Sequence, residues 1–131
     1  LYEGITLASI VQKETLNDLD DKKMVAGVFF NRMKAGMTLG SDVTYQYAAD
    51  KLGIKRDFNL DNPYNLRLHK GLTPTPISTP GVSTLKAVAE PAQHNFLFFL
   101  NGDDDKTYFG KTDAEHQKNI QKYCQKKCQI I

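Results

Sequence analysis

The sequence predicts an α+β domain made of several short helices, one β-hairpin and a long proline-rich ordered loop. Apolar residues recur at helical spacing in the first third of the chain, and a turn-forming stretch later separates two short apolar or aromatic runs. Four of the five prolines fall within residues 54–81, where periodic apolar positions are few. With 131 residues, the chain is long enough to form one domain with its own core.

Two helices are expected at the start of the chain. Residues 5–14 are largely apolar at helical spacing, which predicts a buried helix that ends near Thr15. Asp18 is suited to cap a second helix, because its carboxylate can accept a hydrogen bond from the first turn. The apolar positions of this amphipathic helix continue to Met33, and Gly36 provides a stop.

The middle of the chain combines two shorter helices with a long connection. We expect one helix over residues 44–52, closed by Gly53, and another over residues 83–89. Residues 54–81 lie between them and lack a regular pattern. A connection of this length is uncommon unless it is functional, so it is either a substrate-binding loop or a packed surface loop.

A β-hairpin is predicted towards the end of the chain. Residues 96–100 and 107–110 form the strands, and the acidic turn between them contains Asp103, Asp104 and Asp105. These three aspartates lack the alternating spacing and closing glutamate of a calcium-binding loop. We therefore interpret them as a solvated turn.

A final helix is expected to begin at the capping box of Thr112 to Glu115 and to run through about Lys127. The basic run from Lys122 to Lys127 would then form a solvated helix face. Cys124 and Cys128 would both lie in this helix, where a disulfide between them would introduce strain. Their redox state is left open.

Composition and motifs exclude several classes of function. A formal net charge of +2 is too small to make nucleic acid the expected partner. The longest apolar run, residues 96–100, is far too short to span a membrane. Phosphate-binding, nucleophilic-serine and zinc-ligand motifs are not found, so no metal or organic cofactor is implied.

Carboxylate chemistry remains, and Glu14 is its best candidate. This residue closes a helix that is otherwise largely apolar, so its carboxyl group would lie at the rim of the hydrophobic core. Such surroundings raise the pKa of a carboxyl group and keep a proton available for donation. The alternative, an end-of-helix glutamate exposed to solvent, stays open on composition alone.

Several motifs in order resemble one known family, the YceG/MltG-like endolytic murein transglycosylases. The resemblance covers essentially the whole chain. It rests on residues 7–15, 28–33, 36–42, 63–65, 71–77, 80–81, 91–92 and 96–100, and on the helix that contains Thr112, Glu115 and His116.

The resemblance implies cleavage of the β-1,4 bond between N-acetylmuramic acid and N-acetylglucosamine within glycan strands, leaving a 1,6-anhydro end. It assigns Glu14 as the single general acid and base. The chain departs from the family pattern at Gln12, where an acid is usual, and at Arg67, Thr73 and Thr75 in the long loop. These departures put the shape of the loop in doubt but leave the essential carboxylate in place.

Further residues receive provisional roles. The candidates for substrate binding are Ser41, Asp42, Thr44, Tyr47, Tyr64 and Asn65. Asp42 is either a group that faces the sugar or a helix cap, and Tyr64 is either a sugar contact or a loop anchor. Arg67, His69 and Lys70 could meet the carboxylates of peptidoglycan or lie in solvent. His116 is left out of the catalytic set.

The implied partners are peptidoglycan glycan strands and the cell-wall synthesis machinery, with no nucleic acid. Because the chain opens on Leu1, we expect a fragment of a longer protein. In the family, an N-terminal helix holds the domain at the outer face of the bacterial cytoplasmic membrane. A non-catalytic peptidoglycan-binding module and a muramidase that uses water remain alternatives.

Overall fold

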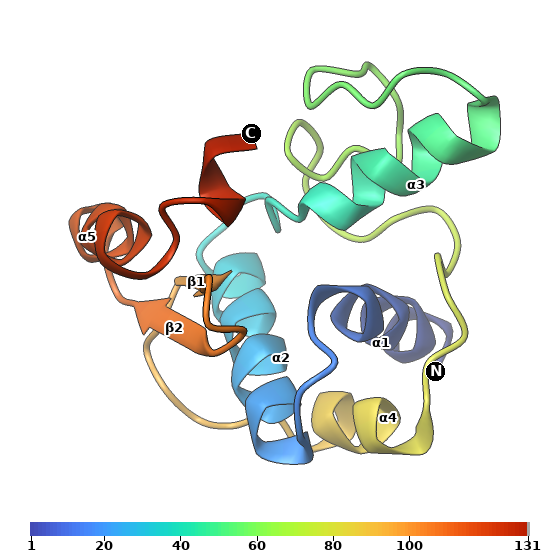
Figure 1. Ribbon diagram of the computed structural model, residues 1–131. Coiled ribbons are helices and arrows are strands. Elements are labelled where there is room, and N and C mark those ends of the chain that lie inside the picture. The colour runs from blue at the N-terminus through green and yellow to red at the C-terminus, as the bar shows by residue number, and fades with distance from the viewer. Residues whose placement is uncertain (131) are drawn as a thin grey trace.

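The computed structural model describes residues 1–130 and confirms the α+β class. Within this range, five α-helices accompany one two-stranded antiparallel sheet (Figure 1). The elements are α1 (Tyr2–Glu14), α2 (Leu19–Lys34), α3 (Asp42–Leu52), α4 (Val82–Ala89), β1 (Phe98–Asn101), β2 (Thr107–Gly110), α5 (Asp113–Tyr123) and a 3-10 helix, η1 (Lys127–Ile130). No helix in the described range is long and apolar enough to cross a membrane.

Local signals for helix ends are confirmed at three places. The side chain of Asp18 accepts a hydrogen bond from the backbone N–H of Asp21 at 3.0 Å, at the start of α2. Gly53 ends α3 in the left-handed conformation, with φ of 67°. Thr112 and Glu115 form the predicted capping box of α5. In each case the residues that make contact lie within a few positions of each other in the sequence, so the sequence alone can specify the helix end.

The C-terminal helix is shorter than predicted. It ends at Tyr123, and Cys124 and Cys128 form a disulfide outside it. The cause is a distant contact: the carboxylate of Asp103 accepts hydrogen bonds from the backbone N–H groups of Lys126 and Lys127, at 3.1 and 3.0 Å. The expected continuous basic helix face is therefore wrong. The aspartates of the acidic turn are exposed, as predicted, and Asp103 in addition binds the backbone of residues 126–127.

Helix α1 forms the centre of the core. It contacts α2, α3 and α4, and Figure 1 shows it lying between α3 and α4. Its buried side chains Leu7, Ile10 and Val11 pack with Phe29 of α2 and Leu66 of the long loop. This burial on several sides explains why residues 4–12 of the helix carry no charged side chain.

Residues 54–81 contain turns and bends but no helix or strand, and their last part is fixed against α1. The backbone N–H of Ile77 donates to Ser9 Oγ at 3.0 Å, and Ser78 Oγ donates to the carbonyl of Ser9 at 2.8 Å. Tyr2 adds a hydrogen bond to the carbonyl of Pro74 at 3.0 Å. The loop therefore packs along the helix that carries Glu14.

Helix α2 positions the segment before the hairpin. Asn31 Nδ2 donates to the carbonyls of His94 and Phe96, at 2.8 and 3.0 Å, and Arg32 Nε donates to the carbonyl of Leu97 at 2.6 Å. Gly27 allows this approach, since an added Cβ would lie 2.5 Å from His94 Nε2 and 2.6 Å from the carbonyl oxygen of Ala92.

We expect Gly27→Ala to lower the free energy of unfolding by about 2 kcal/mol, because the added methyl group must displace backbone. Gly4→Ala is the matched control, since nothing lies within 4 Å of a Cβ at this helical position. Alanine should there be neutral or stabilising by up to about 1 kcal/mol. Urea denaturation of both variants measures the difference, and equal stabilities would contradict the close packing.

Candidate active site

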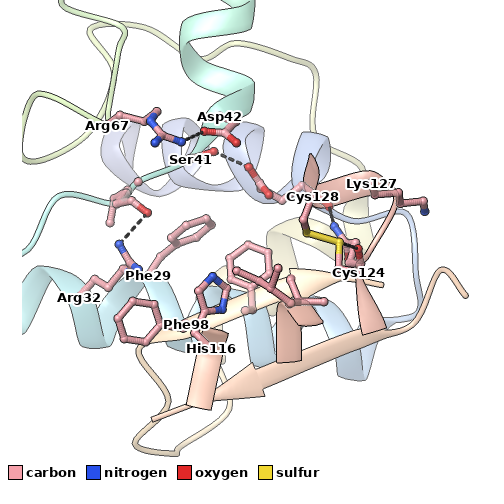
Figure 2. Close-up of a pocket in the computed structure, with 17 residues that line it drawn as sticks. Phe29, Arg32, Ser41, Asp42, Arg67, Phe98, His116, Cys124, Lys127 and Cys128 are labelled. Atoms are coloured by element: carbon pink, nitrogen blue, oxygen red, sulfur yellow. Dashed lines mark hydrogen bonds and ion pairs between the residues drawn. A yellow bond between two sulfur atoms is a disulfide. The ribbon is translucent and has the colours of Figure 1, made fainter. Parts of the chain in front are cut away.

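A pocket of about 360 Å³ lies where the end of α1, the start of α3, β1 and α5 meet. Figure 2 shows its lining side chains converging from these elements. Its polar and charged lining residues are Glu14, Arg32, Ser41, Asp42, Arg67, Asn101, His116 and Lys127. Phe29, Leu39 and three residues of β1 supply an apolar floor.

Glu14 is the last residue of α1 and is partly buried. Its backbone carbonyl accepts a hydrogen bond from Asn101 Nδ2 at 2.8 Å, which ties the end of the helix to the end of β1. The next residue, Thr15, is extended, with φ of −145° and ψ of 138°, so the chain turns away from the pocket. The side chain of Glu14 therefore projects from a fixed point.

The carboxyl group of Glu14 lies at the N-terminus of α3. Ser41 Oγ donates to Glu14 Oε1 at 2.5 Å (Figure 2). The backbone N–H of Val43, in the first turn of α3, also interacts with this carboxyl group. Ser41 stands at the N-cap of α3 but makes no capping hydrogen bond with its side chain, and Glu14 occupies that place instead.

The pKa of Glu14 is raised from 4.5 to about 7, chiefly by burial and to a smaller extent by the negative charge of Asp42. The hydrogen bonds from Ser41 and from the backbone of Val43 lower the pKa and offset part of this effect. Both forms of the carboxyl group are consequently populated near neutral pH. A group with this pKa can donate a proton and then accept one at the same pH.

Asp42 lines the pocket and is paired with Arg67, whose Nη1 lies 2.7 Å from Asp42 Oδ1. The guanidinium group of Arg67 also lies over the ring of Phe58, 5.1 Å from its centroid. Arg67 therefore has a protein partner, rather than standing free in a solvated loop. His69 is exposed and Lys70 is exposed, and neither lines this pocket.

Thr44 and Asn65 lie behind the pocket wall, and each is 0% exposed. Thr44 Oγ1 donates to the carbonyl of Ser41 at 2.7 Å and accepts from the backbone N–H of Leu66 at 3.1 Å. Asn65 Nδ2 donates to the carbonyls of Phe58 and Leu60, at 3.1 and 2.8 Å. Their observed contacts support the loops that carry Ser41 and Arg67.

Tyr47 and Tyr64 pack together beside the pocket, with ring centroids 5.4 Å apart. Tyr64 shares a hydrogen bond of 2.8 Å with Thr75 Oγ1. Tyr47 lines a neighbouring hollow rather than the pocket around Glu14. The pair thus anchors the long loop to α3, and Tyr47 faces the neighbouring hollow.

Gln12 lies away from the pocket. Its Oε1 accepts hydrogen bonds from Thr84 Oγ1 at 2.6 Å and from the backbone N–H of Gly81 at 3.1 Å. This side chain joins α1 to the start of α4. A carboxylate could accept the same two hydrogen bonds, so an acid and an amide can both make this contact.

Four pocket residues were not predicted as site residues: Arg32, Asn101, His116 and Lys127. Arg32 donates to backbone carbonyls and lies 4.9 Å from the centroid of Phe98, and His116 stacks on the same ring at 5.1 Å. Lys127 is paired with Asp105 at the hairpin turn. All four come from segments outside α1. Arg32 and His116 lie within motifs that carry the family resemblance, which was the available signal, whereas no motif marks Asn101 or Lys127.

A second hollow of about 500 Å³ adjoins the first near Glu14. The two share Glu14, Asn101 and Lys127, and the second is bounded by residues 13–17 and Asp105. Glu14 therefore borders both hollows. Among residues 1–130, no cluster of three metal-ligating side chains occurs.

Comparison with known proteins agrees with the earlier resemblance. A family model described as the YceG-like family matches residues 1–122. The chain is 37% identical over 130 residues to a Bacillus subtilis protein named endolytic murein transglycosylase, covering 97% of this chain and 36% of that protein. A Streptococcus pneumoniae protein of the same name is 31% identical over 134 residues, covering 95% of this chain and 24% of that protein.

A crystal structure of a YceG-like protein from Listeria monocytogenes superposes with a TM-score of 0.79 at 38% sequence identity. The match covers 89% of this chain and 39% of that one. The chain thus spans between a quarter and two fifths of these relatives. Since a family model matches nearly its whole length, the chain belongs to the YceG-like family.

Proposed function

We propose that this domain is a lytic transglycosylase that cleaves peptidoglycan glycan strands between N-acetylmuramic acid and N-acetylglucosamine. The observation that carries the proposal is the placement of Glu14, a partly buried carboxyl group in a pocket, with its pKa raised to about 7. The relatives named endolytic murein transglycosylase support the substrate class.

One free carboxyl group is enough for this reaction. Hydrolases that cleave glycosidic bonds generally need a second carboxylate as base or nucleophile. Asp42 is the other acid among the described residues that line the Glu14 pocket, and it is paired with Arg67. This pairing favours a reaction in which the substrate provides its own nucleophile.

In the proposed step, protonated Glu14 donates its proton to the oxygen that links the two sugars, and the bond from that oxygen to C1 of the muramyl residue breaks. The 6-hydroxyl of the same muramyl residue bonds to C1 and gives its proton to Glu14. The products are a free 4-hydroxyl and a 1,6-anhydro end, and the acid is regenerated. Because the attack is intramolecular, proximity lowers the barrier.

Ser41 and the N-terminus of α3 have a clear role in this proposal. They stabilise the carboxylate that exists between the two proton transfers, since a helix N-terminus favours negative charge. The two adjoining hollows that Glu14 borders give room for more than one sugar, as internal cleavage requires. Asp42 and the Tyr47–Tyr64 pair are proposed as substrate contacts, whereas Thr44 and Asn65 act indirectly through the loops.

The same proposal extends to the cellular setting. The domain would act outside the cytoplasmic membrane, anchored by an N-terminal helix that precedes this chain and close to the cell-wall synthesis machinery. Peptidoglycan strands lie in that compartment, which is the physical reason for the location.

Glu14→Gln tests the chemistry, because the amide keeps the size and the hydrogen-bond acceptor but cannot donate the proton. We expect cleavage of glycan strands by the full-length protein to fall at least about 100-fold. Mass spectrometry of the strand ends is the measurement. Retention of anhydro ends in a folded variant contradicts the proposal, and ends heavier by one water indicate a muramidase.

The raised pKa also predicts a pH dependence of stability. The folded state holds the Glu14 proton up to about pH 7, whereas the unfolded state releases it near 4.5. Stability is therefore lost progressively as the pH rises between these values, by up to about 3 kcal/mol relative to Glu14→Gln. Urea denaturation at pH 5 and pH 8 measures it: Glu14→Gln should lose this pH dependence, whereas Glu90→Gln, which removes an exposed carboxylate and leaves Glu14 in place, should keep it.

Two neighbouring substitutions should move the pKa of Glu14 in opposite directions. Ser41→Ala removes a hydrogen bond to the carboxylate and should raise the pKa, whereas Asp42→Asn removes a negative charge and should lower it. NMR titration of the Glu14 carboxyl carbon is the measurement. Shifts of the same sign would show that the surroundings of Glu14 are described incorrectly.

A further inference from the structure

A third hollow, of about 430 Å³, lies beside the pocket that contains Glu14. It is formed by the end of α1, the face of α3 and the beginning of the long loop. The polar residues that line it are Lys13, Gln46, Tyr47, Asp50, Lys51 and Arg56. None of them belongs to the proposed proton-transfer machinery.

This hollow carries an excess of positive charge. Three of its lining residues are cations and one is an acid. Arg56 makes two hydrogen bonds to Asp50, at 3.1 and 2.9 Å, so that one cation is neutralised. Within residues 1–130, Lys13 and Lys51 form no ion pair within 4.0 Å, and their two ammonium groups are available to an external anion.

An aromatic face accompanies these cations. The ring of Tyr47 packs against Tyr64 on one side, and the ammonium group of Lys51 lies 5.6 Å from its centroid. An ammonium group held over an aromatic ring keeps its charge near an apolar surface. The hollow thus combines features that bind a carboxylate with features that bind a short aliphatic chain.

Lys13 connects this hollow to the site of cleavage. It precedes Glu14 in α1 and lines both this hollow and the open space on one side of Glu14. A sugar strand that lies across Glu14 would therefore pass next to Lys13. A substituent that projects sideways from the strand would enter the hollow.

We infer that this hollow is a binding site for the carboxylates of the peptide attached to the muramyl residue. The inference rests on the proposed function, because a peptide that is attached to a strand is brought to the hollow when its strand lies at Glu14. It assigns substrate selection to Lys13 and Lys51, in place of His69 and Lys70 of the long loop. The attraction between these two ammonium groups and the peptide carboxylates is long-range and partly screened by salt. Peptide binding should therefore weaken as the salt concentration increases.

Binding of a synthetic stem peptide with free carboxylates to the full-length protein tests the inference without any need for cleavage. In Lys13→Met/Lys51→Met, we expect the Kd measured by NMR titration at low salt to rise about five- to tenfold. Lys86→Met/Lys118→Met is the charge-matched control, since both lysines are exposed and lie outside the hollow. This control should bind as the wild type does.

Two further comparisons identify the chemistry. The same peptide with its carboxylates amidated should bind the wild type about as weakly as the free peptide binds the double variant. In cleavage assays, the double variant should lose efficiency on peptide-bearing strands and keep it on strands freed of peptides. If the wild type and the double variant bind the peptide equally, the inference is overturned, even where cleavage is intact. If the wild type cleaves no strands at all, the proposed function is overturned instead.

Discussion

The position of one carboxyl group, that of Glu14, is the constraint on which the site depends. Glu14 stands at the C-terminus of its own helix, where the helix dipole disfavours a negative charge, and it is partly buried. The N-terminus of α3 and the hydroxyl of Ser41 oppose both effects. The resulting pKa of about 7 follows from this balance rather than from any single contact.

This balance requires that α1 and α3 keep a fixed position relative to each other. Asn101 holds the end of α1 through its backbone carbonyl, and Thr44 fixes the start of α3 to the loop that contains Leu66. The hydroxyl of Ser9 fixes a later part of that loop to α1. Fully or partly buried polar side chains therefore do much of the positioning, because each must find a partner once it leaves water.

Prediction from sequence succeeded where the deciding contacts are local. Asp18, Gly53 and the capping box at Thr112 are each determined within a few residues, and all three are observed. It failed at the C-terminal helix, because Asp103 binds the backbone of Lys126 and Lys127 from the hairpin turn. Helical spacing carries no information about a competing acceptor more than twenty residues away.

The sequence by itself determined the α+β class, the family and the choice of Glu14, because apolar spacing, capping residues and ordered motifs are properties of the linear chain. Only the tertiary structure decided which polar residues face the pocket. Thr44 and Asn65 lie close in sequence to pocket residues and yet turn inward, whereas Asn101 and Lys127 arrive from distant segments. The direction of a polar side chain depends on the partner that the fold brings to it, and that partner is set by packing across the whole domain.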